Sequence, residues 1–213
     1  MGWTLAPNVS FCTTSERVVF LDTARDRYFA LPGAQSAAFR TWIDSETAAS
    51  PPPVAQLLID ANLIEVCDAA GSPCRSAITP AVRALREVDV KATVRDQFEV
   101  GCCLLRVRHA LRRHGLLATL ERWRQIRDER IDDATRHQAA VFMRARRRIP
   151  LAENCLHDSL AMIAWLNRRG ASASIVFGVT GIPFRAHCWV QLGDQVLNDA
   201  LDHVAPFTPI LQR

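Results

Sequence analysis

Three residues in the C-terminal third of the chain have side chains that together could perform nucleophilic catalysis: Cys155, His187 and Asp199. Cys155 lies in "ENCLHDSLA", and the other two lie in "RAHCWVQLGDQVLND". An imidazole with an ordinary pKa of about 6.5 can take a proton from a thiol at neutral pH. A carboxylate can fix the tautomer of that imidazole and stabilise its charged form. The three residue types predict acyl-transfer chemistry at a cysteine.

Cys155 is expected in the first turn of a helix over residues 155–168, because Asn154 is a favourable N-cap residue. The helix dipole and the free N–H groups of a first turn favour a thiolate, so they lower the pKa of a thiol there. An apolar stripe should anchor this helix on a core; it consists of Leu156, Leu160, Ile163 and Leu166. Cys155 itself can then project from the helix end into a cleft.

His187 lies in the strand-like run "AHCWVQL", where side chains alternate between two faces. His187 shares its face with Trp189 and Gln191, and the opposite face is the more apolar of the two. Asp199 reaches His187 if a three-residue loop, 193–195, pairs Leu192 with Val196, or if a bulge has the same effect. A two-residue loop at 193–194 would instead turn Asp199 away. We predict the first arrangement.

The remaining cysteines and histidines are interpreted as structural or surface residues, because free cysteine is among the most buried residue types. The cysteines expected in the core are Cys102, Cys103 and Cys188, and the histidines given a core or surface place are His109, His114, His137, His157 and His203. Seven cysteines with no Cys-x-x-Cys spacing argue against a disulfide framework and a zinc site. No metal and no cofactor are therefore expected.

Helices and strands alternate in a pattern that predicts an α+β fold with two domains, 1–75 and 76–213. The first contains strand-like runs at 18–21 and 28–31, two helices, and a strand-like end at "NLIEV". The second begins after a linker at 67–80, continues through a mostly helical middle segment with a C-cap at Gly115, and ends in a helix followed by an antiparallel sheet.

The composition excludes several classes of protein. Hydrophobic residues make up 49% of the 213-residue chain, which is enough for a packed core. No apolar run reaches the roughly 18 residues of a membrane span, and no secretory signal is visible, so a reducing cytoplasm is expected. The net charge is +4, but the arginines are spread over several faces, so a nucleic-acid partner is not expected.

The segments "NCLHDSLAMIAWLNRRG", "VFGV" and "RAHCWVQLGDQVLND" resemble the transglutaminase-like, papain-related leader peptidases of lasso-peptide biosynthesis, the B-type maturation proteins of the microcin class. The resemblance implies a catalytic triad of Cys155, His187 and Asp199. One departure is that Cys188 follows the histidine, where an aliphatic residue is more usual in that family.

The N-terminal segments "VVFLD", "DRYFALPGAQSAAFRTWI" and "LLIDANLIEV" resemble a small winged-helix-like peptide-recognition domain related to the pyrroloquinoline-quinone D protein. This resemblance implies that residues 1–75 capture the leader of a precursor peptide by adding it as a strand to a sheet edge. The residues expected to contact the leader are Tyr28, Phe29, Leu31 and Phe39.

Together the resemblances imply a cysteine peptidase that cleaves the leader–core amide of a lasso precursor. The freed core amine would then be used by an ATP-dependent macrolactam synthetase, a separate partner protein. A transglutaminase-type acyltransferase remains an alternative, because the same triad serves both reactions. A non-catalytic DNA-binding or scaffold protein is a further alternative, although the expected helix at "PPPVAQLLID" has no Arg or Lys to contact DNA.

Overall fold

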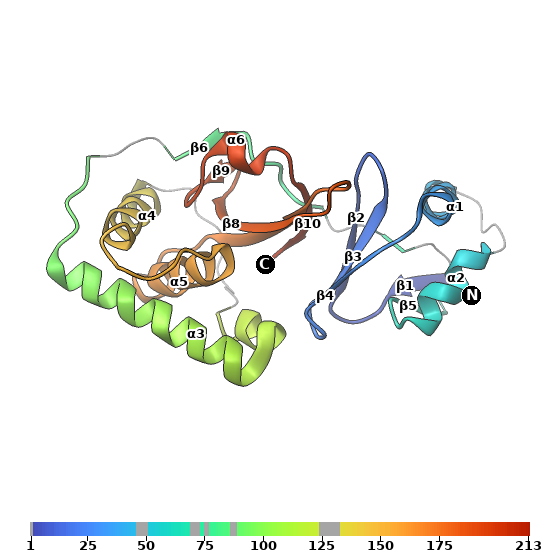
Figure 1. The fold of residues 1–213 in the computed structure, drawn as a ribbon, viewed down its shortest axis with the longest axis horizontal. Coiled ribbons are helices and arrows are strands. Elements are labelled where there is room, and N and C mark those ends of the chain that lie inside the picture. The colour runs from blue at the N-terminus through green and yellow to red at the C-terminus, as the bar shows by residue number, and fades with distance from the viewer. Residues whose placement is uncertain (1, 46–50, 69–72, 75–76, 86–88, 124–132) are drawn as a thin grey trace. The chain divides into compact units, whose positions relative to one another are not determined.

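The computed structural model describes residues 2–45, 51–68, 73–74, 77–85, 89–123 and 133–213. It is a mixed α+β structure with two compact units (Figure 1). The N-terminal unit comprises Met1–Ala77 with Val179–Arg185, and the C-terminal unit comprises Ile78–Gly178 with Ala186–Arg213. Residues 69–72 and 75–76 of the predicted linker lie outside the described part of the chain, and its first residue, Cys67, belongs to a strand.

Two small antiparallel sheets form the strands of the N-terminal unit. The first has the order β2-β3-β4, and the second pairs β1 with β5. The strands are β1 (Gly2–Leu5), β2 (Val9–Thr13), β3 (Val18–Asp22), β4 (Arg27–Ala30) and β5 (Ile64–Cys67). The central strand, β3, is buried at every position, as its run "VVFL" requires. Strands β3, β4 and β5 match the predicted runs, but the short strands β1 and β2 were not predicted.

Two helices, α1 (Gly33–Asp44) and α2 (Pro53–Asp60), contribute the rest of the core of the N-terminal unit. The rings of Phe11, Phe20 and Phe39 meet with centroids 5.3–5.5 Å apart. Helix α2 ends where Asn62 takes a left-handed φ of 55°, and the N–H of Leu63 then bonds to the carbonyl of Leu58. The winged-helix-like character of this unit stays a prediction.

Three helices of the C-terminal unit pack together, and α5 lies against the other two and against strand β8 (Figure 1). They are α3 (Val94–Arg122), α4 (Asp133–Arg146) and α5 (Cys155–Arg168). A capping box between Thr93 and Asp96 starts α3, and Gly115, with a φ of 75°, interrupts its helical backbone where a C-cap was predicted. Helix α5 stops at Gly170, as predicted, because its φ of 71° lets the next N–H reach back to Leu166.

The sheet of the C-terminal unit has the order β10-β7-β8-β9-β6. Its strands are β6 (Arg83–Ala84), β7 (Ser174–Val179), β8 (Ala186–Leu192), β9 (Gln195–Val196) and β10 (Thr208–Gln212), and the short helix α6 (Leu201–Val204) precedes β10. Strands β7, β8 and β9 were predicted, whereas β6, β10 and α6 were not. Strand β6 runs parallel to β9, so the sheet is not purely antiparallel.

The predicted register of the β8–β9 hairpin is wrong. Leu192 pairs with Gln195 and Gln191 with Val196, so the loop has two residues and not three. Gly193 takes a φ of 59°, the left-handed conformation that the first central position of such a tight turn requires. Among the described residues, no helix is both long enough and apolar enough to cross a membrane.

Candidate active site

Cys155 stands at the first position of α5, as the sequence predicted. The side chain of Asn154 caps this helix: its Oδ1 accepts a hydrogen bond of 3.0 Å from the backbone N–H of His157. The cap places Cys155 in the first turn, where backbone N–H groups have no acceptor within the helix. Its side chain is half-buried, so a substrate could reach the sulfur.

The segment that leads into Cys155 is held by one buried arginine. The guanidinium of Arg146, on α4, donates to the carboxylate of Asp158 at 2.7 Å and to the backbone oxygens of Ile149, Leu151 and Ala152. The same carboxylate accepts the backbone N–H of Asn154. Arg146 therefore fixes both the approach to the helix and its first turn.

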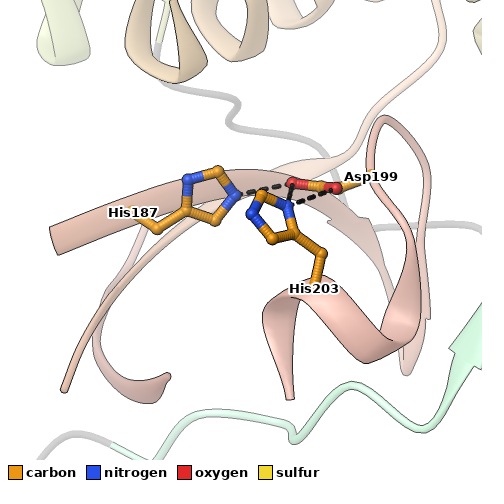
Figure 2. Close-up of side chains that lie close together, drawn as sticks. All are labelled: His187, Asp199 and His203. Carbon is orange, nitrogen blue, oxygen red and sulfur yellow. Dashed lines mark hydrogen bonds and ion pairs between the residues drawn. The ribbon is translucent and has the colours of Figure 1, made fainter. Parts of the chain in front are cut away.

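His187 and Asp199 form a direct hydrogen bond. Figure 2 shows the ring of His187, on β8, directed at the carboxylate. The distance between its Nε2 and Oδ2 of Asp199 is 2.6 Å. Because Nε2 is used by the carboxylate, Nδ1 is the ring nitrogen left to interact with the thiol of Cys155. His187 thus hydrogen-bonds to Asp199 and also influences the pKa of Cys155.

Asp199 reaches His187 although the observed register should turn it away. The chain leaves the strand pattern directly after β9, with bends over residues 197–199. The side-chain oxygen of Asn198 accepts the N–H of Val190 at 2.7 Å, so a side chain occupies the place of a backbone acceptor in the ladder. This departure frees Asp199 from strict alternation and gives the effect that a bulge was expected to give.

Contacts with two residues of β8 keep Cys155 ionised. Interactions with the side chain of Cys188, with the ring of His187 and with the backbone of Cys188 all lower the pKa of Cys155. Burial opposes these effects, but together they lower the pKa of Cys155 to about 4. Cys188 is buried as predicted, yet the sequence analysis missed its contact with the nucleophile.

The partners of His187 favour the charged form of its ring. Hydrogen bonds to Asp199 and to Cys155 raise the pKa of His187 to about 9, against the opposing effect of burial. Burial alone would raise the pKa of Asp199, but hydrogen bonds from His187, from His203 and from the N–H of Ala200 lower it to about 2. The site therefore holds a thiolate, an imidazolium and a carboxylate at neutral pH.

His203 is the second histidine on Asp199, and the sequence analysis had given it no role. Its Nδ1 lies 2.9 and 3.1 Å from the two carboxylate oxygens. Figure 2 shows both contacts as dashed lines. Residues 199 and 203 are four apart across the start of α6, so a helical turn brings them together. The Asp-x-x-x-His spacing could have indicated this contact from the sequence. It does so only if the short helix α6 is also predicted, and it was not.

The face of β8 that carries His187 packs into a small apolar core. It is not the more polar face that the sequence suggested. Trp189 and Gln191 are both buried there, and Trp189 packs with Val204 and Phe207. The ring of Phe207 lies 5.2 Å from that of His187. An apolar wall beside the imidazole limits its orientation and shields its bond to Asp199 from water.

Three potential ligand atoms gather at this place. Within the described part of the chain, His187, Asp199 and His203 each offer one atom, and these atoms lie within 4.8 Å of one another. Two imidazoles and a carboxylate suit a divalent transition metal. Such an ion would take Nε2 of His187 away from Asp199 and would therefore compete with the hydrogen bond between them.

The four residues expected to contact a leader peptide differ in exposure. Phe29 is 37% exposed on β4, an edge strand, and Tyr28 is half-buried with its ring 5.5 Å from that of Phe184. Leu31 and Phe39 have no exposed surface and belong to the core, so they could act only by supporting such a surface.

Comparison with known families identifies the C-terminal unit. Residues 98–212, more than half of the chain, match the family described as the transglutaminase-like superfamily. The chain belongs to that superfamily. The match includes Cys155, His187 and Asp199, and it confirms the transglutaminase-like part of the predicted resemblance.

One curated relative of this transglutaminase-like chain is the microcin J25-processing protein McjB of Escherichia coli, with 47% identity over 47 residues. The match covers 22% of the chain and spans less than a quarter, 23%, of the length of that relative. No solved structure matches this transglutaminase-like protein.

Proposed function

We propose that the protein is a cysteine peptidase that binds the leader of a ribosomally made lasso precursor peptide and cleaves the leader–core amide. The observation that carries the proposal is the hydrogen bond between His187 and Asp199, together with Cys155 at the start of α5, where its pKa is lowered partly by His187. The short but strong similarity to a microcin-processing protein supports the choice of substrate class.

The charged groups define the reaction steps. The Cys155 thiolate attacks the carbonyl carbon of the scissile amide, and the imidazolium of His187 donates its proton to the departing core amine. Asp199 holds the ring with Nδ1 toward the sulfur and stabilises its positive charge. Water then attacks the thioester with His187 as the base, and the leader is released as a free acid.

The oxyanion formed on the substrate carbonyl needs hydrogen-bond donors. The first turn of α5 supplies backbone N–H groups with no acceptor in the helix, and the N–H of Cys155 is the donor nearest the reacting sulfur. The positive end of the helix dipole adds to the same stabilisation. The first turn of α5 therefore stabilises both the oxyanion and the thiolate of Cys155.

The N-terminal unit is proposed to capture the leader. It would act as a winged-helix-like recognition domain, related to the pyrroloquinoline-quinone D protein, with the leader added as a strand beside β4. Phe29 would then offer the exposed apolar contact and Tyr28 a neighbouring one. The core amine released by cleavage would be consumed by an ATP-dependent macrolactam synthetase.

A transglutaminase-type acyltransferase is the second candidate, and the family match favours it as directly as it favours a peptidase. Both reactions pass through the same thioester. They differ in whether water or an amine attacks it, so the mass of the leader product separates them. A free carboxylic acid indicates hydrolysis, and an added amine indicates acyl transfer.

The test uses the full chain, a precursor peptide and mass spectrometry. Replacing the nucleophile in Cys155→Ala should reduce leader release at least about 1,000-fold while precursor binding persists. Cys102→Ala, a half-buried cysteine on α3, is the matched control and should cleave as the wild type does. Cleavage by Cys155→Ala at the wild-type rate would overturn the proposal.

A further inference from the structure

Two histidines contact the carboxylate of Asp199, whereas proton transfer in the proposed peptidase mechanism needs only one of them. Nε2 of His187 lies 2.6 Å from Oδ2 of Asp199, and Nδ1 of His203 lies 2.9 Å from Oδ1 and 3.1 Å from Oδ2. Figure 2 shows both rings turned toward this one carboxylate. The second imidazole gives the cluster a ligand set that a Cys-His-Asp mechanism does not require.

The spacing of these atoms suits a zinc ion. Zinc binds imidazole nitrogen and carboxylate oxygen at about 2.0–2.2 Å, so two ligand atoms of a tetrahedral site lie roughly 3.3 Å apart. The three distances to the carboxylate oxygens are slightly shorter than that, and the three potential ligand atoms all lie within 4.8 Å of one another. A small rotation of the Asp199 side chain would therefore make room for the ion without movement of β8 or α6.

The types of ligand favour zinc over the common alkaline-earth ions. Imidazole nitrogen suits zinc and its transition-metal neighbours, whereas magnesium and calcium take oxygen ligands. Two imidazoles and one carboxylate also form the protein part of some zinc sites that keep a fourth position open. The cluster contains no cysteine, so the spacing of the cysteines in the sequence gave no indication of it.

The surroundings of the cluster give an ion access and hold its ligands. The side chain of His203 is 51% exposed, so an ion can enter past it, whereas His187 and Asp199 are largely covered. The N–H of Ala200 donates to Oδ1 of Asp199 at 2.8 Å, and the ring of Phe207 lies 5.2 Å from that of His187. A hydrogen bond to a ligating carboxylate and an apolar shell beside a ligating imidazole both support metal binding.

We propose that Zn²⁺ binds to His187, Asp199 and His203 and reversibly inhibits the protein. The ion takes the place of the hydrogens on Nε2 of His187 and Nδ1 of His203, which leave for solvent or for the other ring nitrogen. With the ion on Nε2 and a proton on Nδ1, the ring of His187 has no free nitrogen to accept the thiol proton. The carboxylate of Asp199 then binds the metal and no longer supports a charged ring. The inhibition rests on the proposed peptidase function, but the binding of zinc does not.

The first test measures zinc binding by the full-length protein and needs no peptide substrate. Cys155→Ala, which removes a competing thiolate, is freed of metal and titrated with Zn²⁺ against a chromophoric chelator. We expect one ion per chain at the site, and zinc X-ray absorption should show only nitrogen and oxygen neighbours. An excess of Mg²⁺ should not displace the zinc, because magnesium prefers oxygen ligands.

Matched variants in the same Cys155→Ala background assign the site. His203→Ala removes one ligand and should weaken zinc binding at least about tenfold, since even the outer contacts of metal ligands are worth that much. His203→Asn keeps an N–H donor for Asp199 but lacks the imidazole, so its affinity should fall by a similar factor. His109→Ala, which removes an exposed histidine of α3, is the control and should bind zinc as its parent does.

The second test adds Zn²⁺ to precursor cleavage by the chain with Cys155 intact. Cleavage should fall over the concentration range in which zinc binds, and EDTA should restore it. In the two His203 variants the half-inhibitory zinc concentration, measured against each variant's own rate without zinc, should rise at least about tenfold. If no cleavage occurs without zinc, the proposed peptidase function fails, and the binding test still decides whether the site exists.

Three results would contradict the zinc site or its effect. One is a sulfur neighbour in the X-ray absorption spectrum, which would place the ion on a cysteine. Another is an equal affinity for zinc in the His203 variants and in His109→Ala. The third is a wild-type protein that binds zinc through His203 and still cleaves the precursor at its full rate.

Discussion

Cys155 and His187 act on each other as charged partners. The pKa of the thiol is lowered to about 4 and that of the imidazole is raised to about 9, so both charges are present between those values. The stabilisation from a lowered pKa is lost as pH falls through about 4, and that from a raised pKa is lost as pH rises through about 9. The interaction between Cys155 and His187 contributes to both shifts, so the two stabilisations are not added together.

Alkylation of Cys155 by iodoacetamide measures this charge directly, because only the thiolate reacts. In the wild type the rate should change little from about pH 9 down to about pH 5 and should then fall with a midpoint near about 4. His187→Ala removes one of the hydrogen bonds that lower the pKa, so its midpoint should lie higher. His157→Ala, which changes a neighbouring histidine on the same helix, is the control. A wild-type midpoint near the ordinary thiol pKa of about 8.5 would contradict the ion pair.

His203 is interpreted as a positioning residue that holds the carboxylate of Asp199 in the orientation His187 needs. Losing its hydrogen bond in His203→Ala should lower kcat/KM for precursor cleavage about fivefold, because one such bond is worth about 1 kcal/mol. His203→Asn keeps an N–H donor near Nδ1 and should restore most of the activity. The alanine variant should also move the upper limb of the pH–rate profile to higher pH, because a donor that competes for Asp199 is gone. A purely structural role would change the stability of the protein without that movement.

At the scale of single elements, the sequence predicts what depends on nearby residues and not what depends on distant ones. Helix α5, Cys155–Arg168, followed from its cap, its apolar stripe and the glycine at 170 that follows it, and all three are found. The register at Gly193 was wrong, because Asn198 takes a ladder position with its side chain, and alternation alone cannot predict that exchange. The predicted contact between His187 and Asp199 is found only because the bend after β9 compensates for the register error.

Arg146 connects α4 to the start of α5, and this connection can be tested by its effect on stability. Arg146→Met should lower the free energy of unfolding by about 3–5 kcal/mol, because it removes a buried cation and leaves Asp158 and three backbone oxygens without their donor. Arg95→Met breaks the exposed pair with Glu99 on α3 and should cost less than about 1 kcal/mol. Urea denaturation measures both free energies of unfolding. Equal losses in the two variants would mean that Arg146 stabilises the fold no more than an exposed ion pair does.

At the scale of the whole molecule, the assignments of the two units rest on different kinds of evidence. The family match begins at residue 98 and falls mainly on the C-terminal unit, where the motif residues lie. The N-terminal unit was predicted from strand and helix patterns, and it contains two further strands whose partners the sequence does not reveal. Strand β6 shows the same limit, because Arg83 pairs with Gln195, more than a hundred residues away. Such long-range pairing has no signal in the local pattern of apolar residues.

The proposed division of labour predicts that binding and chemistry can be impaired separately. Phe29 lies opposite Phe20 in the register, at an edge of the three-stranded sheet, with 37% of its surface exposed. In a Cys155→Ala background, Phe29→Asp should weaken the binding of a fluorescent leader peptide about tenfold, because a charge replaces an apolar contact. In the otherwise wild-type chain the same change should leave the alkylation rate of Cys155 unaltered. Val66→Asp, an exposed position on β5, is the matched control, and an equal loss of affinity in both variants would remove the basis for a leader site beside β4.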